Sequence, residues 1–135
     1  MSGIIIHSDG AARGNPGPAG AGALLENEKG EVVAKVCKYL GEATNNQAEY
    51  TALILGLEEA EKNGATRISV FCDSELVVKQ VKGEYKVKNA GLRPLFQEVM
   101  KHLRKIGIYT ISHIPREKNK KADELANLAI DSQAY

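Results

Sequence analysis

Four acidic residues stand at places where a side chain can leave the protein core and hold a ligand. Asp9 and Asp73 each end a short apolar stretch that is typical of a β-strand. Glu49 lies one turn inside a predicted helix, and Asp123 lies in the first turn of another. Because ligand sites form at the ends of such elements, we expect all four side chains to meet in one crevice.

This set of side chains indicates metal-assisted hydrolysis. Carboxylates that are held together repel one another, and their pKa values rise unless a cation neutralises them. Oxygen ligands without nitrogen or sulfur partners favour Mg²⁺ or Mn²⁺. Two such ions about 3.5–4 Å apart can activate a water molecule and stabilise a leaving oxygen in phosphodiester cleavage.

Each acid also has a structural explanation when it is considered alone. An Asp after a strand is a common turn residue, and a Glu in a helix usually faces solvent. An Asp in the first turn of a helix complements the helix dipole. The metal hypothesis therefore depends on the fold bringing the four acids together.

The hydrophobic pattern predicts an α/β fold with a five-stranded mixed sheet in one domain, residues 1–135. Three antiparallel strands come first, and helical crossovers then add parallel strands, so that helices flank the sheet. The predicted strands cover residues 3–8, 19–26, 31–40, 66–72 and 108–114, and the predicted helices cover residues 44–62, 75–81, 92–106 and 120–132.

Turn and cap signals set the boundaries of these elements. Residues 10–18 are rich in glycine and proline and are predicted to form a loop. Thr44 and Gln47 have the spacing of a capping box at the start of the first helix. The tail, residues 133–135, is expected to fray.

The composition is that of a soluble globular protein that does not enter a membrane. The 18 basic and 17 acidic residues give a net charge of +1, so any attraction to nucleic acid must be local. No apolar run approaches the roughly 18 residues of a membrane span, and the first residues lack a signal-peptide pattern. Cys37 and Cys72 are predicted to be buried free thiols, which favours a reducing, cytoplasmic location.

Four motifs, in this order, resemble the signatures of the type 1 ribonuclease H family, and they cover nearly the whole chain. The family has a ribonuclease H-like fold with a five-stranded mixed sheet flanked by helices, in agreement with the predicted order of elements. The motifs are Ser8-Asp9-Gly10 with Gly14-Asn15-Pro16-Gly17, Thr44-Asn45-Asn46-Gln47-Ala48-Glu49, Cys72-Asp73-Ser74 and Ala122-Asp123-Glu124-Leu125-Ala126.

The resemblance implies endonucleolytic cleavage of the RNA strand in an RNA–DNA hybrid, leaving 3′-hydroxyl and 5′-phosphate ends. Asp9, Glu49, Asp73 and Asp123 would carry two Mg²⁺ ions, with Mn²⁺ as a substitute. Glu49 would also lie near the ribose 2′-hydroxyl, the group that distinguishes RNA from DNA. The family default is a monomer without an obligate protein partner.

The same resemblance implies contacts with the substrate. Asn15, Asn45 and Asn46 match positions that contact the hybrid, and Thr44 matches a residue of a phosphate pocket. Glu75 stands beside a backbone contact, where glutamine is common in the family. Turn and cap chemistry is the alternative explanation for Thr44 and the asparagines.

Compared with better-known members of the family, the chain lacks a long basic protrusion, and we expect no separate hybrid-binding domain before Met1. Only residues 83–91 and Lys82 remain of the protrusion, so hybrid affinity is expected to be weaker and more sensitive to salt.

The resemblance also implies a residue that transfers protons during turnover, a loop histidine in many members and an arginine in some compact ones, and His113 and Arg116 are the candidates here. For His113, a partly buried structural role is an equal alternative, and for Arg116 the alternative is a solvated surface charge. We expect His113→Ala to slow turnover several-fold without abolishing it.

Two other functions remain open from sequence. One is a relaxed nuclease that also cuts double-stranded RNA or RNA–DNA junctions. The other is an inactive hybrid-binding module, which the presence of all four acids disfavours.

Overall fold

The computed structural model describes residues 3–133. The predictions for residues 1–2, where no targeting signal is expected, and for residues 134–135, expected to fray, lie outside this range. The elements are β1 (Gly3–Ala12), β2 (Gly17–Asn27), β3 (Val32–Ala43), α1 (Asn45–Lys62), β4 (Arg67–Cys72), α2 (Glu75–Val81), α3 (Arg93–Ile106), β5 (Ile108–His113), a 3₁₀ turn (Arg116–Lys118) and α4 (Lys120–Ser132).

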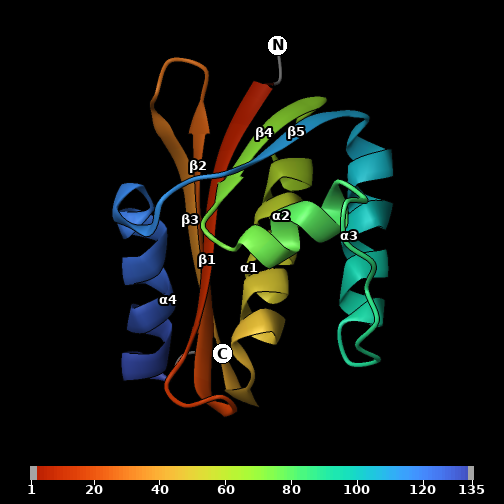
Figure 1. Ribbon diagram of the computed structural model, residues 1–135. Helices are drawn as coiled ribbons and strands as arrows, with labels where there is room; N and C mark the ends of the chain where they lie inside the picture. The colour runs from red at the N-terminus through yellow and green to blue at the C-terminus, as the bar shows by residue number, and fades with distance from the viewer. Residues whose placement is uncertain (1–2, 134–135) are drawn as a thin grey trace.

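The five strands form one mixed sheet in the order β3-β2-β1-β4-β5. The first three strands pair antiparallel, whereas β4 pairs parallel with both β1 and β5. Helix α4 covers one face of the sheet, and α1 covers the other, with α2 and α3 on the outer side of α1 (Figure 1). This arrangement confirms the predicted fold class.

Helix α1 is the central helix of the core. Thr44 caps it through the predicted capping box with Gln47, which satisfies backbone N–H groups that the first turn leaves free. Its buried side chains pack on apolar side chains of the sheet, and α3 packs against its other side. The largest fully buried apolar side chains are Tyr50, Ile6, Leu25, Leu53, Leu57, Ile68 and Leu103.

The glycine-rich stretch after Asp9 is mainly strand, which corrects the predicted loop over residues 10–18. Strand β1 continues to Ala12, β2 begins at Gly17, and only residues 13–16 connect them. Gly10 pairs with Ala21, and a Cβ atom on Gly10 would lie 2.2 Å from the backbone carbonyl carbon of Ala48. Glycine is needed here because helix α1 approaches the strand closely, and not because the chain turns.

Helix α4 approaches the opposite face of the sheet in the same way. A Cβ atom on Gly20 would lie 2.3 Å from the backbone oxygen of Ala126. A Cβ atom on Gly22 would lie 2.6 Å from Cβ of Leu125. The glycines of β2 therefore set the depth at which α4, and the acid that it carries, sits on the sheet.

The two cysteines are both free, as predicted, but only Cys72 is buried. Cys37 is half-buried because it lies on β3, an edge strand of the sheet. None of the helices described combines the length and the apolar character that crossing a membrane requires.

Candidate active site

Two of the four acids emerge side by side where the parallel pairing of β1 and β4 stops. The last paired residues are Ser8 and Cys72, and the next residue in each segment is an acid. Asp9 lies within β1, three residues before its end, which corrects the prediction that it ends the strand. Asp9 is only 4% exposed and Asp73 is half-buried, so both side chains are at least partly shielded from bulk solvent.

Helix α1 supplies the third acid of the cluster. The N–H group of Gly10 donates a hydrogen bond of 2.8 Å to Oε1 of Glu49, so β1 orients this side chain directly. Carboxylate oxygens of Asp9, Glu49 and Asp73 lie within 4.8 Å of one another. We call these three residues the acidic cluster. One comes from β1, one from α1, and one from the residue that follows β4.

Burial and mutual repulsion perturb the titration of this cluster. Burial, followed by the nearby charges of Glu49 and Asp73, raises the pKa of Asp9 to about 10. Burial and the charge of Asp73 raise the pKa of Glu49 to about 8, although the hydrogen bond from Gly10 opposes this increase. Near neutral pH the cluster therefore retains protons that a divalent cation would displace.

The acidic cluster fits a hard divalent cation. Its side chains offer carboxylate oxygens alone, the ligands that Mg²⁺ and Mn²⁺ prefer. Oδ1 of Asp73 is buried and accepts no hydrogen bond from any residue in the described range. An unsatisfied buried oxygen is costly, and a cation bound between the carboxylates would satisfy it.

Asp123 lies beside the acidic cluster on the first turn of α4 but is outside the group of three close carboxylates. Asn127, one helical turn later, donates a hydrogen bond of 3.2 Å to Oδ1 of Asp123. On the other side, a guanidinium nitrogen of Arg116 lies 3.9 Å from the same oxygen, and the Arg116 side chain is 79% exposed. All four acids line one cavity of about 410 Å³, together with Gly10, Ala11, Ala12, Asn45 and Arg116.

Of the predicted substrate residues, Asn45 lines this cavity and Asn15 is bonded to Asn45. Oδ1 of Asn45 accepts a hydrogen bond of 3.1 Å from the N–H group of Ala12. Oδ1 of Asn15 accepts a hydrogen bond of 3.0 Å from the N–H group of Asn45, which ties residues 13–16 to the start of α1. Both asparagines are exposed, and Asn45 lines the cavity.

The other predicted substrate residues lie farther from the cavity. Thr44 is half-buried, and its hydroxyl accepts a hydrogen bond of 3.2 Å from the N–H group of Gln47. Asn46 is exposed on the first turn of α1, and Glu75 is exposed at the start of α2, where it pairs with Lys79 at 3.8 Å. None of these side chains lines the cavity.

His113 does not line the cavity of the four acids, although β5 pairs it with Cys72, the residue before Asp73. It is the last residue of β5, and it is exposed. The alternative of a partly buried structural histidine is therefore wrong. Of the two candidates for proton transfer, Arg116 lines the cavity and His113 does not, and a role of either residue in turnover stays a prediction.

Two residues that sequence reasoning missed connect the fourth acid to the loop over residues 13–16. Arg13 donates a hydrogen bond of 3.2 Å to Oδ1 of Asn127 and pairs with Asp131 at 2.8 Å. Asn127 in turn bonds Asp123. The four-residue spacing from Asp123 to Asn127 on a predicted helix was the available signal, because such residues are neighbours on a helix surface.

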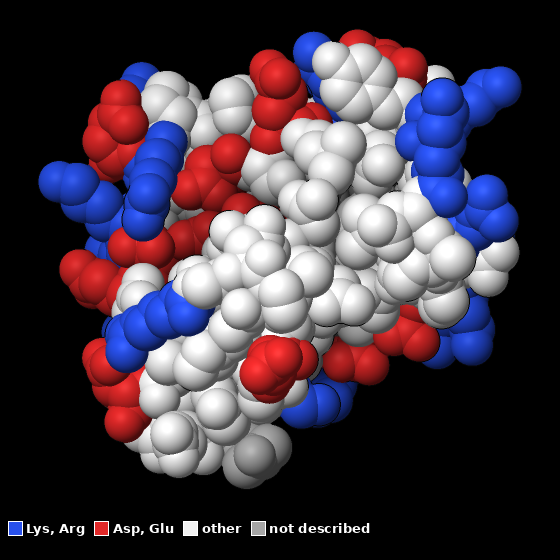
Figure 2. Space-filling view, turned by 60° about the horizontal axis from the view of Figure 1, so that its bottom comes forward, with Lys and Arg blue, Asp and Glu red and all other residues white. Residues whose placement is uncertain are grey.

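Charge is unevenly distributed over the surface of the molecule although the net charge is only +1. Acidic side chains gather on one part of the face seen in Figure 2, and lysine and arginine side chains border it. Such a surface can attract a polyanion through its basic side chains and a cation through its acids.

The order of strands, the helices on both faces and the acids beside the parallel pair define the class of proteins with a ribonuclease H-like fold. The family model described as "Reverse transcriptase-like" matches residues 7–129. The structure is similar to that of RNase H1 from the halophilic archaeon Halobacterium salinarum NRC-1, with a TM-score of 0.93 and 42% sequence identity over 96% of this chain and 98% of that one.

Two further solved structures are equally similar. The N-terminal RNase H domain of Rv2228c from Mycobacterium tuberculosis has a TM-score of 0.95 and 41% identity over 98% of this chain and 96% of that one. LC11-RNase H1, solved in complex with an RNA/DNA hybrid, has a TM-score of 0.92 and 45% identity over 96% of this chain and 98% of that one. The chain belongs to the type 1 ribonuclease H family.

The curated relatives include longer proteins. The chain spans 36% of the bifunctional protein Rv2228c, with 42% identity over 132 residues. It spans 64% of the ribonuclease HI of Halobacterium salinarum, with 44% identity over 128 residues.

Proposed function

We propose that this protein is an endonuclease that hydrolyses the RNA strand of RNA–DNA hybrids. The observation that carries the proposal is the acidic cluster, in which three separate elements hold carboxylates within 4.8 Å of one another around a buried, unpartnered oxygen. Membership of the type 1 ribonuclease H family and the similarity to a hybrid-bound relative support the choice of substrate.

Asp9, Glu49, Asp73 and Asp123 would hold two Mg²⁺ ions, for which Mn²⁺ is an alternative. When bound, the ions supply activation of a water molecule and stabilisation of the leaving 3′ oxygen, so that the products carry 3′-hydroxyl and 5′-phosphate ends. The N–H group of Gly10 orients Glu49 for this role, and the side-chain amide of Asn127 orients Asp123.

The residues around the cavity would position the hybrid without reading its base sequence. Asn15 and Asn45 present short polar side chains that can bond sugar and phosphate oxygens. Glu49 and Asn45 both line the cavity and both belong to α1, and Glu49 would contact the ribose 2′-hydroxyl, which selects the RNA strand. Arg116 would meet a phosphate at the cavity, where its positive charge offsets the acids.

The test is cleavage of an end-labelled RNA–DNA hybrid with Mg²⁺, with Mn²⁺ or with a chelator, beside matched RNA–RNA and DNA–DNA duplexes. We expect metal-dependent cutting of only the RNA strand of the hybrid, and its loss in Asp9→Asn. Glu42→Gln, which changes an exposed acid on β3, is the matched control and should retain full activity.

The remaining outcomes discriminate between the alternatives. Cutting of double-stranded RNA or of RNA–DNA junctions at a comparable rate would identify a relaxed nuclease. Hybrid binding without cutting under either metal would overturn the proposal in favour of a binding module.

A further inference from the structure

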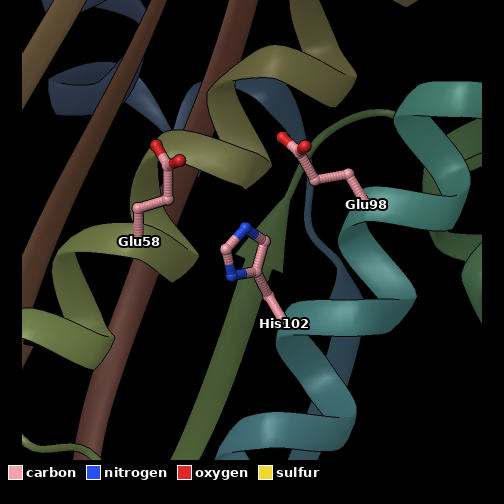
Figure 3. A group of neighbouring side chains, drawn as sticks. All are labelled: Glu58, Glu98 and His102. Carbon is pink, nitrogen blue, oxygen red and sulfur yellow. The ribbon is translucent and has the colours of Figure 1, made fainter.

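A second group of metal-binding side chains lies away from the acidic cluster, between α1 and α3. Glu58 is carried by α1, and Glu98 and His102 stand one turn apart on α3 (Figure 3). One potential ligand atom from each residue lies within 4.8 Å of the other two. Two helices that are separate in the chain therefore converge on one point.

The imidazole of His102 is oriented by a residue outside this group. Its Nδ1 atom contacts a carboxylate oxygen of Glu61, and the other oxygen of Glu61 pairs with Lys105 at 3.1 Å. The second ring nitrogen, Nε2, is thereby left toward Glu58 and Glu98, and Figure 3 shows a ring nitrogen directed between their carboxylates. A carboxylate that holds the far nitrogen of an imidazole is the usual support of a metal-binding histidine.

The two carboxylates have no cation of their own. Two neighbouring acids on the same helix do have cationic partners. Glu59 pairs with Lys62 at 3.7 Å, and Glu61 pairs with Lys105. Within residues 3–133, no ion pair includes Glu58 or Glu98. Acidic side chains alone on a surface would not indicate a metal site. Here an oriented imidazole lies between two carboxylates without a cationic partner, and together they offer a metal ion both nitrogen and oxygen ligands.

We infer that Glu58, Glu98 and His102 bind a divalent transition metal ion of the Zn²⁺ class and thereby clamp α3 onto α1. Three side chains with a solvent molecule as fourth ligand match the coordination that Zn²⁺ accepts, and the imidazole disfavours Mg²⁺. Helix α3 packs mainly against α1, so a clamp at this point fixes the helix that is least held by the sheet.

This site is independent of the proposed nuclease activity. Glu58 stands nine residues after Glu49 on α1, which corresponds to about 13 Å along the helix axis. None of its three residues lines the cavity of the acidic cluster. Its test therefore does not depend on whether the protein cleaves hybrids.

The experiment is titration of Zn²⁺ by calorimetry, with excess Mg²⁺ present and in an Asp9→Asn background, so that the acidic cluster does not contribute. We expect one equivalent of Zn²⁺ to bind. Affinity should fall at least tenfold in Glu98→Gln and in His102→Gln, and should be unchanged in Glu124→Gln, which alters an exposed acid on α4. Zn²⁺ about a hundredfold above its Kd should raise Tm by roughly 5–10 °C.

One further variant, together with Glu98→Gln, keeps the inference open to refutation. Glu61→Gln removes only the support of the imidazole, so Zn²⁺ affinity should fall by about 10–100-fold without disappearing. Glu98→Gln leaves the contact between His102 and Glu61 in place. If His102→Gln fails to fold, the Zn²⁺ affinity of Glu98→Gln therefore tests the inference. The inference would be overturned if Glu98→Gln bound Zn²⁺ as tightly as the protein without this change. It would also be overturned if Glu124→Gln lost as much Zn²⁺ affinity as Glu98→Gln.

Discussion

The side chains around the cavity differ in how firmly the fold holds them. Glu49 is fixed by a backbone N–H group of Gly10, and Asp123 by the amide of Asn127. Arg116, in contrast, has a side chain that is 79% exposed and lies 3.9 Å from Asp123, a distance at which an exposed ion pair adds little to stability. The Arg116–Asp123 pair therefore contributes little to folding, and a contact of Arg116 with a phosphate of the substrate stays a prediction.

We predict that Arg116→Ala lowers kcat/KM for hybrid cleavage about tenfold or more and leaves the free energy of unfolding nearly unchanged. Loss of the guanidinium removes a cation beside the acids, where a phosphate would otherwise meet only negative charge. Steady-state cleavage kinetics and urea denaturation measure the two effects.

Lys118→Ala is the control for this prediction, because its side chain is exposed and lies outside the cavity of the acidic cluster. The several-fold slowing expected of His113→Ala from sequence remains a prediction, and it should be smaller than the effect of Arg116→Ala. A larger effect of His113→Ala would show that the histidine acts from outside the cavity seen here.

At the scale of the elements, close packing of helices on the sheet decides where the acids stand. Gly10 lets α1 approach β1 until Glu49 reaches the backbone of that strand. Gly22 lets α4 approach β2 on the other face, and α4 carries Asp123. The distance between these acids thus depends on two positions that have no side chain.

We predict that Gly22→Ala destabilises the protein by about 1–3 kcal/mol and reduces cleavage. The added methyl group would lie 2.6 Å from Cβ of Leu125 and 2.7 Å from the backbone nitrogen of Ala126, so α4 must move outward with Asp123. Urea denaturation and cleavage at saturating Mg²⁺ measure both effects.

Gly91→Ala is the matched control, because the nearest atom to its added methyl group is a side-chain oxygen of Asn89 at 3.1 Å, which can move. Unchanged stability of Gly22→Ala would mean that α4 can shift without cost, contrary to the packing described.

At the scale of the whole molecule, the acidic cluster weakens the fold in the absence of metal. The pKa of Asp9 is raised to about 10, first by burial and then by Glu49 and Asp73. Between about pH 4 and that value, the folded protein holds a proton that the unfolded chain releases. The free energy of unfolding therefore falls as pH rises through this range.

We predict that Asp9→Asn stabilises the metal-free protein by more than about 1 kcal/mol at pH 7, and that the gain grows toward pH 9. The amide carries no charge at any pH, so folding no longer requires the uptake of a proton at this position, and the size of the side chain is kept. Urea denaturation in EDTA from pH 5 to 9 measures the difference, with Glu42→Gln as the exposed control. Mg²⁺ should stabilise the wild type more than Asp9→Asn. If the difference in free energy of unfolding between the two proteins did not change with pH, this explanation would be contradicted.

The sequence by itself determined the class of the fold and the identity of the acids. Hydrophobic periodicity and the capping box are local, so the order of strands and helices, the limits of α2 and α4 and the start of α1 could be predicted from them. The choice of Asp9, Glu49, Asp73 and Asp123 came from residue type, placement near element ends and the family resemblance, and the structure brings all four to one cavity.

Only the tertiary structure decided what depends on contacts between distant segments. Residues 10–18 carry turn signals, yet Gly10 and Gly17 are strand residues, because pairing with neighbouring strands and the approach of helices require small side chains. Nothing local separates Arg116 from His113, since the direction of each side chain is set by how the chain leaves β5. The convergence of α1 and α3 at His102 has the same origin, because 44 residues of chain separate Glu58 from His102 and their proximity follows from packing alone.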